Sequence, residues 1–273
     1  MKQNKLMIAI VALILVVVFF SAKTWIRQDD NRPSSAVGGD SVLENAPSEK
    51  LEASAQPLKV GDDKKDEAAT ATVPPDKSRI KMTLPKPFFK GTPAEIQGAF
   101  NLEAPRGGKS REPIIVPDGC DSLLSRDCKV TSSDPESVFG ELSFITDGDK
   151  EWDAFVEISP HVQWVQIDLG REREIFAICV WHCHKEPRVY RDVVWQISND
   201  PEFTDGVVTV FNNDHDNSAK LGVGKDKEYI ETYEGRPLPV NAVKGRYVRC
   251  YSRGNTTNAM NHYTEIEVYG KRI

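Results

Sequence analysis

The sequence lacks the short motifs of several common catalytic centres. It contains no G-x-S-x-G nucleophile turn, no H-E-x-x-H zinc motif and no P-loop. It also lacks an excess of positive charge, because 35 Lys and Arg residues stand against 41 Asp and Glu, for a formal net charge of −6. No basic stripe interleaved with aromatic residues is present. We therefore expect a non-enzymatic protein with no nucleic-acid partner.

Cysteines are few and odd in number, and the first hundred residues contain none. If the C-terminal part is exported to an oxidising compartment, disulfides are permitted there. The local pair expected from spacing is Cys120 with Cys128. An odd number leaves at least one thiol unpaired within the chain. The five are Cys120, Cys128, Cys179, Cys183 and Cys250.

A long apolar run occurs only at the N-terminus, where residues 6–22 follow the basic stretch MKQNK. A run of about 17 residues can just cross the hydrocarbon core of a bilayer. A secretory signal has a similar layout but needs small residues at −3 and −1 of its cleavage site. Cleavage after Ser21 or Ala22 would put Phe19 or Phe20 at −3. We expect residues 1–27 to be an uncleaved signal-anchor, with a cleaved signal peptide as the alternative.

Residues 28–80 have no aromatic side chain and are rich in Pro, Ser, Ala and charged residues. Such a segment cannot bury enough apolar surface to offset its chain entropy, so we expect a disordered linker. The positive-inside rule keeps Lys2 and Lys5 in the cytoplasm and places the rest of the chain outside it. The predicted location is therefore a single-pass membrane protein whose C-terminal domain is periplasmic or extracellular.

The remaining chain shows little helical periodicity and several short segments in which apolar and polar residues alternate. Turn-forming clusters separate these segments, and no helical pattern intervenes. This arrangement predicts an antiparallel β-sandwich or barrel. The expected strands cover residues 164–170, 175–184, 192–198, 206–211, 245–252 and 264–270.

The expected strand 175–184 ends in the unusual stretch CVWHCH. Alternation puts Cys179 and Cys183 on one apolar face and His182 and His184 on the other. The spacing C-x-x-x-C-H is one residue too long for c-type haem, so we expect no haem. Opposite faces also prevent all four side chains from binding one zinc ion. We predict buried cysteines and surface histidines, either at a solvent edge or on a polar binding surface.

Five segments of the sequence carry a recognisable pattern: VTSSD (130–134), ITDGDKEWD (145–153), WVQIDLG (164–170), VVWQISNDPEF (193–203) and the pair GRYVRCYS and TEIEVYG (245–252 and 264–270). In this order they resemble the discoidin or coagulation-factor type-C domains of the galactose-binding-like superfamily. The resemblance implies an all-β, antiparallel jelly-roll β-sandwich of eight strands over residues 128–273, which binds ligands through loops at one end. Residues 81–127 would be an extension that packs on the sandwich. Four further segments are similar to those of an uncharacterised, often membrane-anchored bacterial subgroup of the family. They are GTP (91–93), WHCHK (181–185), FNNDHDNS (211–218) and MNHYTE (260–265).

The resemblance also implies a structural calcium ion beside the Asp-Gly loop. The matching residues are Asp147, Asp149 and Glu265. Calcium takes six to eight oxygen ligands from carboxylates, carbonyls and water. The alternative is that Asp147 and Gly148 only form a turn and that Glu265 faces solvent.

Many bacterial members of the family bind carbohydrate, and some animal members bind phospholipid or protein. Carried over by position, the ligand-binding candidates are His184, Arg188, Asn212, Asn213, Asp214, Asp216, Asn255 and His262. For the Asn- and Asp-rich loop 212–217 the alternative is a set of Asx turns, in which side chains bond their own backbone.

Three functions remain open at this point. The first is a membrane-anchored, non-enzymatic module that binds a glycan or another ligand of the cell envelope. The second is a protein-interaction or scaffolding domain without a sugar site. The third is a metal-dependent hydrolase. Its metal would need His182, His184, His215 and Asp214 to converge through a closure of loops that the sequence does not establish.

Overall fold

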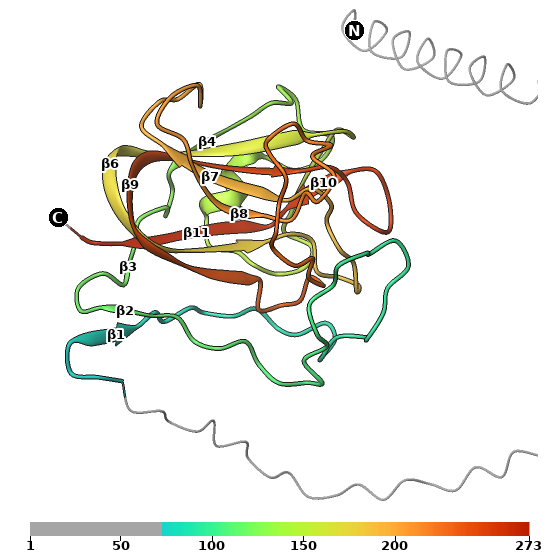
Figure 1. Cartoon of the computed structure of the whole chain (residues 1–273), viewed down its shortest axis with the longest axis horizontal. Coiled ribbons are helices and arrows are strands. Elements are labelled where there is room, and N and C mark those ends of the chain that lie inside the picture. Colours follow the sequence, from blue (N-terminus) through green and yellow to red (C-terminus); the bar gives the residue numbers. More distant parts are fainter. Residues whose placement is uncertain (1–72, 273) are drawn as a thin grey trace, which may run out of the picture. The chain divides into compact units, whose positions relative to one another are not determined.

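The structure is a computed structural model that describes residues 73–272 (Figure 1). The predicted anchor at residues 1–27 and most of the predicted linker at 28–80 lie outside the described residues. Within the described part, no helix has the length and apolar character needed to cross a membrane.

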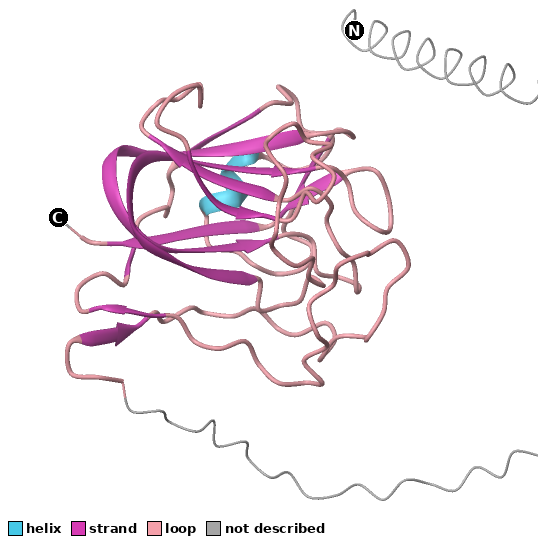
Figure 2. Cartoon of the chain, viewed as in Figure 1, coloured by secondary structure: helices cyan, strands magenta, loops and turns pink. Residues whose placement is uncertain are grey.

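The described residues form short strands, two long strands and one 3-10 helix (Figure 2). The two long strands are β6 and β9, and they lie at the centre of the main sheet. In chain order the elements are β1 (Lys77–Arg79), β2 (Ile115–Pro117), β3 (Ser122–Leu123), β4 (Lys129–Ser132), η1 (Leu142–Thr146), β5 (Val156–Ile158), β6 (Gln163–Trp181), β7 (Val194–Ser198), β8 (Val208–Asn212), β9 (Arg236–Ser252), β10 (Asn261–Tyr263) and β11 (Glu265–Gly270).

The main sheet has seven antiparallel strands in the order β3-β11-β6-β9-β7-β8, with β4 also paired to β6. The first half of β6 pairs with β4 and with the second half of β9, whereas its second half pairs with β11 and the first half of β9. Between these halves the register shifts from Asp168 to Arg173, and Gly170 has a φ of +77°. The sheet therefore folds over at this point into the two layers of a sandwich (Figure 1). The all-β antiparallel sandwich predicted from the sequence is confirmed.

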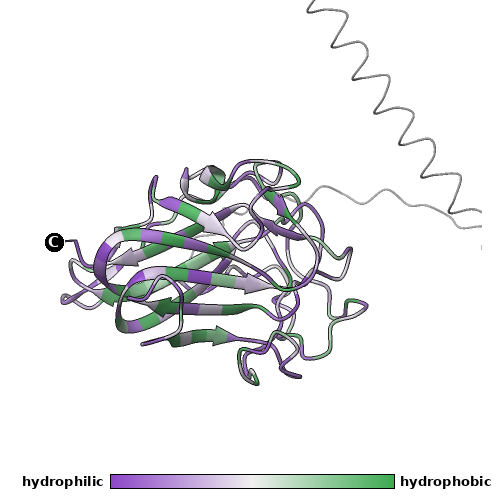
Figure 3. Ribbon diagram, turned by 90° about the horizontal axis from the view of Figure 1, so that it is seen from above, coloured by the Kyte–Doolittle hydropathy of each residue, from purple (hydrophilic) through white to green (hydrophobic). Residues whose placement is uncertain are grey.

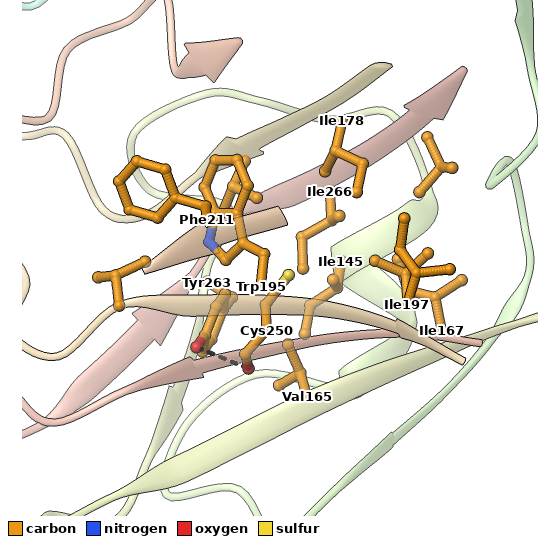
Figure 4. Close-up of a cluster of buried hydrophobic side chains, with 14 of the residues drawn as sticks. Ile145, Val165, Ile167, Ile178, Trp195, Ile197, Phe211, Cys250, Tyr263 and Ile266 are labelled. Carbon is orange, nitrogen blue, oxygen red and sulfur yellow. Dashed lines mark hydrogen bonds between the residues drawn. The ribbon is translucent and has the colours of Figure 1, made fainter. Parts of the chain in front are cut away.

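The space between the two layers holds the main apolar core (Figure 4). Its largest side chain is Trp195 of β7, which packs on Phe211 of β8 with ring centroids 4.8 Å apart. The hydroxyl of Tyr263 donates to the carbonyl of Cys250 at 3.1 Å, so its one buried polar group is paired. Hydropathy alternates along the strands because successive side chains point to opposite faces (Figure 3). Burial of this cluster is the main driving force for the fold.

The outer face of β6 and β11 is also buried, because the N-terminal extension covers it. Ile80, Ile114, Val116 and Cys120 of the extension pack with Ala177 of β6 and Tyr269 of β11 in a second apolar cluster. The predicted linker, 28–80, therefore extends too far at its C-terminal end, because residues 77–80 belong to the folded domain. Residues 77–79 pair with β2 as strand β1, and Ile80 is only 4% exposed.

The expected disulfide between Cys120 and Cys128 does not form, and all five cysteines are free thiols. Cys120 lies in the second cluster, outside the sandwich, whereas Cys128 packs against the main core. The Cys128 thiol contacts the Leu124 carbonyl at 3.3 Å. Because the two side chains belong to different clusters, a bond between them would require one to leave its layer.

The stretch CVWHCH is buried as a whole, which confirms one expectation and corrects another. Cys179 and Cys183 are 0% and 3% exposed, as predicted. The surface position predicted for His182 and His184 is wrong, since neither side chain is exposed. Strand β6 ends at Trp181, and two other loops cover the histidines. His182 Nδ1 lies 2.6 Å from Glu231 Oε1, and His184 Nε2 lies 2.9 Å from the Lys150 carbonyl.

We expect Cys250→Ser to destabilise the fold by about 1–3 kcal/mol, because it places a hydroxyl without a partner in the main core at nearly constant volume. Burial also raises the pKa of the Cys250 thiol, consistent with an apolar site. Urea unfolding would measure the loss. The matched control is Cys128→Ser, whose hydroxyl has the Leu124 carbonyl within reach. An equal loss for both variants would contradict this reading of the core.

Candidate functional site

Most of the predicted ligand residues lie in or next to three loops, which follow β6, β8 and β9. Hydrogen bonds join these loops. Arg191 donates to the Gly254 carbonyl at 3.1 Å, and Arg253 donates back to Arg191 at 2.8 Å. Asn213 connects the third loop, because its amide donates to the Val193 carbonyl and its Oδ1 accepts from the Val193 amide. The three loops are therefore hydrogen-bonded to one another.

The Asn- and Asp-rich loop 212–217 uses its side chains largely on its own backbone. Asn212 Oδ1 accepts from the Asp214 amide at 2.8 Å, and Asp216 Oδ1 accepts from the Ser218 amide at 3.0 Å. The two carboxylate oxygens of Asp214 accept from the Ser218 and Ala219 amides. Asp214 is fully buried, whereas Asp216 is exposed. These contacts match the Asx-turn alternative. In this loop His215 and Asp216 are exposed, and Asn212 and Asn217 are half-buried.

Two members of this loop approach Asp192, and the three carboxylates could hold a metal ion. One oxygen from each of Asp192, Asp214 and Asp216 lies within 4.8 Å of the other two. In the part of the chain that the structure describes, no other such group of acidic, His or Cys side chains occurs. The triad already has compensating partners, because Arg253 forms an ion pair with Asp192 and the Ser218 hydroxyl donates to it at 2.8 Å. Burial raises the pKa of Asp214, and the Ser218 hydroxyl holds the pKa of Asp216 below its usual range.

A second group of predicted residues surrounds the buried phenol of Tyr190. Tyr190 pairs with Asn255 through a β-bridge, and its hydroxyl lies 2.8 Å from His262 Nδ1. His262 Nε2 lies 2.9 Å from Glu157 Oε2, so a neutral imidazole accepts from Tyr190 and donates to Glu157. Arg188 is buried and paired with the exposed Glu186. In this group only Glu186 and part of Glu157 reach the surface.

Asn255 and His184 are also committed to contacts within the protein. Asn255 Oδ1 accepts from the Thr257 and Asn258 amides, and its Nδ2 donates to Asn258 and to the Met260 carbonyl. His184 bonds the Lys150 carbonyl and is fully buried. These two residues therefore fix the shape of loops and contribute no accessible surface.

The three residues matched to a calcium site do not converge in the structure. Asp147 and Asp149 are exposed, and each accepts a backbone amide two residues further on, at 2.8 Å and 3.0 Å. Glu265 is 1% exposed and accepts the Gly148 amide at 3.0 Å. Burial raises the pKa of Glu265 to about 8. The donor set predicted for calcium is therefore divided between solvent and interior and does not fit the ion.

An exposed aromatic patch, made of Phe88, Trp152 and Lys185, was missed in the sequence. Phe88 of the extension and Trp152 of the Asp-Gly loop meet edge to face, with ring centroids 5.4 Å apart and planes inclined by 64°. Phe88 is 54% exposed, and the Lys185 ammonium lies 5.1 Å from the Trp152 ring centroid. The sequence signal that could have indicated this patch is the adjacent pair Phe88 and Phe89. The only other aromatic residue of the extension, 81–127, is Phe100.

A hollow lies beside the aromatic patch, with a cavity volume of about 580 Å³. It is formed by the extension and by the loop that follows His184. Phe89 follows Phe88 of the patch in the sequence, and Pro187 lies two residues after Lys185. Because both Phe89 and Pro187 line the hollow, it adjoins the patch. The lining residues are Phe89, Lys90, Gly91, Thr92, Pro93, Gly107, Gly108 and Pro187.

A larger groove, of about 900 Å³, runs between residues 105–115 and the start of β9. Its arginines already have carboxylate partners, because Arg106 pairs with Glu234 and both Arg111 and Arg236 pair with Glu103. Pro237 and Pro239 line it on the β9 side. Of the other charged residues that line it, Lys109 and Glu112 are exposed, so any charge that the groove offers to an ionic ligand comes from these two.

His262 supplies a pH-dependent term in stability, because burial lowers the pKa of its imidazole to about 4. The unfolded chain binds this proton below about pH 6.5, whereas the folded protein resists it until about pH 4. The stabilisation is present above pH 6.5 and is lost as the pH falls towards 4. Groups facing the ring are Glu157, Tyr190, Arg188 and His182.

We expect the free energy of unfolding of the wild type, relative to His262→Gln, to fall by on the order of 3 kcal/mol between pH 7 and pH 4. Urea unfolding at several pH values would measure it. The difference from the variant is needed because the raised pKa of Glu265 acts in the opposite direction from about pH 4.5 to 8. Parallel curves for the two proteins would contradict the assignment.

Comparisons with known proteins give likenesses to solved structures of carbohydrate-binding modules. No protein-family model and no curated protein sequence matches the chain. A family 89 glycoside hydrolase from Clostridium perfringens is 18% identical, with a TM-score of 0.43, over 55% of this chain and only 15% of the hydrolase. The CBM32 module of AlyQ, in complex with 4,5-unsaturated mannuronic acid, is 16% identical over 52% of this chain and 95% of the module, with a TM-score of 0.38. A chitosan-binding module from the chitosanase/glucanase of Paenibacillus sp. IK-5 is 20% identical over 55% of this chain and 99% of the module, with a TM-score of 0.40.

Proposed function

We propose that the described domain is a non-enzymatic module that binds carbohydrate. The observation that carries the proposal is the patch of Phe88, Trp152 and Lys185, which come from three separate segments beside the 580 Å³ hollow. Large aromatic rings normally bury their surface, so a half-exposed phenyl ring in contact with an indole ring is a candidate contact surface.

The patch has the two kinds of group that a sugar needs. The aromatic rings offer an apolar surface to the C–H face of a pyranose ring, and Lys185 offers three N–H donors to its hydroxyl groups. Glu186, on the same loop, is exposed and adds carboxylate acceptors. A small number of charged groups beside an apolar surface is typical of small-molecule sites. No step of catalysis is part of the proposal.

A protein-interaction domain is the second candidate, and Phe100 is the observation that favours it. This side chain is 91% exposed and lies outside the aromatic patch. Its backbone is held in place, because the amides of Phe100 and Asn101 both donate to Glu228 Oε2, at 2.6 Å and 2.8 Å. An exposed ring on an anchored backbone is suited to contact with another protein.

The proposal for location rests on the sequence of residues 1–27. The apolar run 6–22 would anchor the chain in a membrane, with the binding domain outside the cytoplasm. Residues 28–72 would then separate the domain from the membrane surface, where a glycan of the cell envelope is accessible.

A glycan array probed with the full-length chain would test the function, and Phe88→Ala would test the site. We expect the variant to weaken the dissociation constant for the best glycan at least about fivefold, because a stacked ring contributes on the order of 1 kcal/mol. Isothermal titration calorimetry would measure it. The matched control is Phe100→Ala, which should bind as the wild type does. Absence of any bound glycan would contradict the function, and an unchanged constant for Phe88→Ala would contradict the site.

The retained anchor predicts that the membrane-extracted protein begins at or near Met1. Its physical reason is the bulky residue at −3 for either cut, Phe19 or Phe20. Intact-mass measurement or N-terminal sequencing would check it. A mature N-terminus near Lys23 would instead establish a cleaved signal peptide.

A further inference from the structure

A buried ion pair lies beneath the Asp-Gly loop. The Lys150 ammonium lies 2.7 Å from Glu267 Oε1, and the two side chains are 4% and 3% exposed. The second oxygen of Glu267 accepts from the Tyr269 hydroxyl at 2.6 Å. The ammonium also lies 5.3 Å from the ring centroid of Trp181. The ammonium therefore contacts a carboxylate and the face of an aromatic ring, and the carboxylate accepts from the ammonium and from a hydroxyl group, in a buried site.

A second cation, from the segment between β3 and β4, lies against the outer side of the same loop. Gly148 has a φ of +89°, and the guanidinium of Arg126 lies where a Cβ on this residue would be. The positive charges of Lys150 and Arg126 both act on Glu265, whose carboxyl accepts the Gly148 amide. The two acidic residues of the loop, Asp147 and Asp149, face solvent instead. The buried carboxylates beneath the loop therefore have one buried cation, the Lys150 ammonium, while the Arg126 guanidinium acts on Glu265 from an exposed side chain.

We propose that Lys150, and not a bound calcium ion, is the cation that fixes the conformation of residues 147–152. Calcium would need six to eight converging oxygen ligands, and the carboxylates matched to such a site do not converge. Lys150 supplies a positive charge at the buried carboxylate of Glu267 from within the chain. A covalently attached ammonium needs no ion from solution.

The stretch CVWHCH holds the same loop from the other side. His184 Nε2 donates to the Lys150 carbonyl at 2.9 Å, and the Cys183 thiol contacts the Trp152 carbonyl at 4.0 Å. The main chain on either side of Glu151 is thus bonded to the residues that follow β6. The Lys150 side chain is bonded to Glu267 of β11. Lys150 is therefore a positioning residue for Trp152. This last step rests on the proposed function, because Trp152 belongs to the proposed carbohydrate site.

The first experiment measures the melting temperature of the full-length chain in EDTA and in millimolar calcium chloride. All samples carry Asp216→Asn, which removes the separate carboxylate triad as a source of calcium dependence. We expect the same melting temperature in both solutions, since a ligand that binds only the folded state would raise it. A calcium-dependent rise that is abolished by adding Asp147→Asn would overturn the proposal.

The second experiment removes the internal cation. Lys150→Met keeps an unbranched side chain of nearly the same length and leaves the Glu267 carboxylate buried with no cation. We therefore expect the melting temperature to fall by about 6–20 °C. The matched control is Lys185→Met, an exposed lysine of the neighbouring loop, which should change it by less than about 2 °C. Adding Glu267→Gln to Lys150→Met should restore part of the loss. Equal melting temperatures for Lys150→Met and Lys185→Met would overturn the proposal.

The melting experiments need no sugar, so their outcome is separate from that of the glycan array. If the array finds a glycan, its dissociation constant should be the same in EDTA and in calcium for the wild type. If the array finds none, the proposed function fails while the melting temperatures still decide the role of Lys150. If Lys150→Met does not fold, the comparison of EDTA and calcium in the first experiment decides it.

Discussion

The outer face of β6 and β11 has to be covered, and much of the structure follows from this requirement. The face combines apolar side chains such as Ala177 and Cys179 with the carboxylates of Glu265 and Glu267. Water cannot cover the first group without cost, and an apolar cover would leave the second unpaired. The extension covers the apolar part, and the Asp-Gly loop covers the carboxylates with Lys150. Both segments are thereby fixed in positions that bring Phe88 and Trp152 together.

The strand pattern and the sandwich could be predicted because alternation is a local property of the sequence. The strands expected at 192–198 and 264–270 correspond closely to β7 and β11. The continuation of β6 from Gln163 to Trp181 could not be predicted, because Gly170 and the charged residues after it have the composition of a turn. In the structure they form the bend of one long strand.

The structure buries most of the residues predicted to bind a ligand, including His184 and His262. Whether a polar side chain in a loop reaches solvent depends on other segments, and periodicity carries no information about them. For His184 the covering segment is the Asp-Gly loop, and for His182 it is the segment around Glu231. The aromatic patch was missed for the same reason, since its two rings come from segments separated by more than sixty residues.

The pairing of β1 with β2 has a mechanical consequence. Residues that precede 73 connect to the domain through β1, which is joined to β2 by only three paired positions. A pull along the chain from its N-terminal side would therefore load this short ladder before it reaches the long ladders of β6 and β9. Once β1 has separated, the next residue to be pulled from its contacts would be Ile80. Its removal would open the second apolar cluster, in which Cys120 packs with Ala177 and Tyr269. The covering segment would therefore be the first part to detach, and its loss would expose the apolar side chains of the outer face to water.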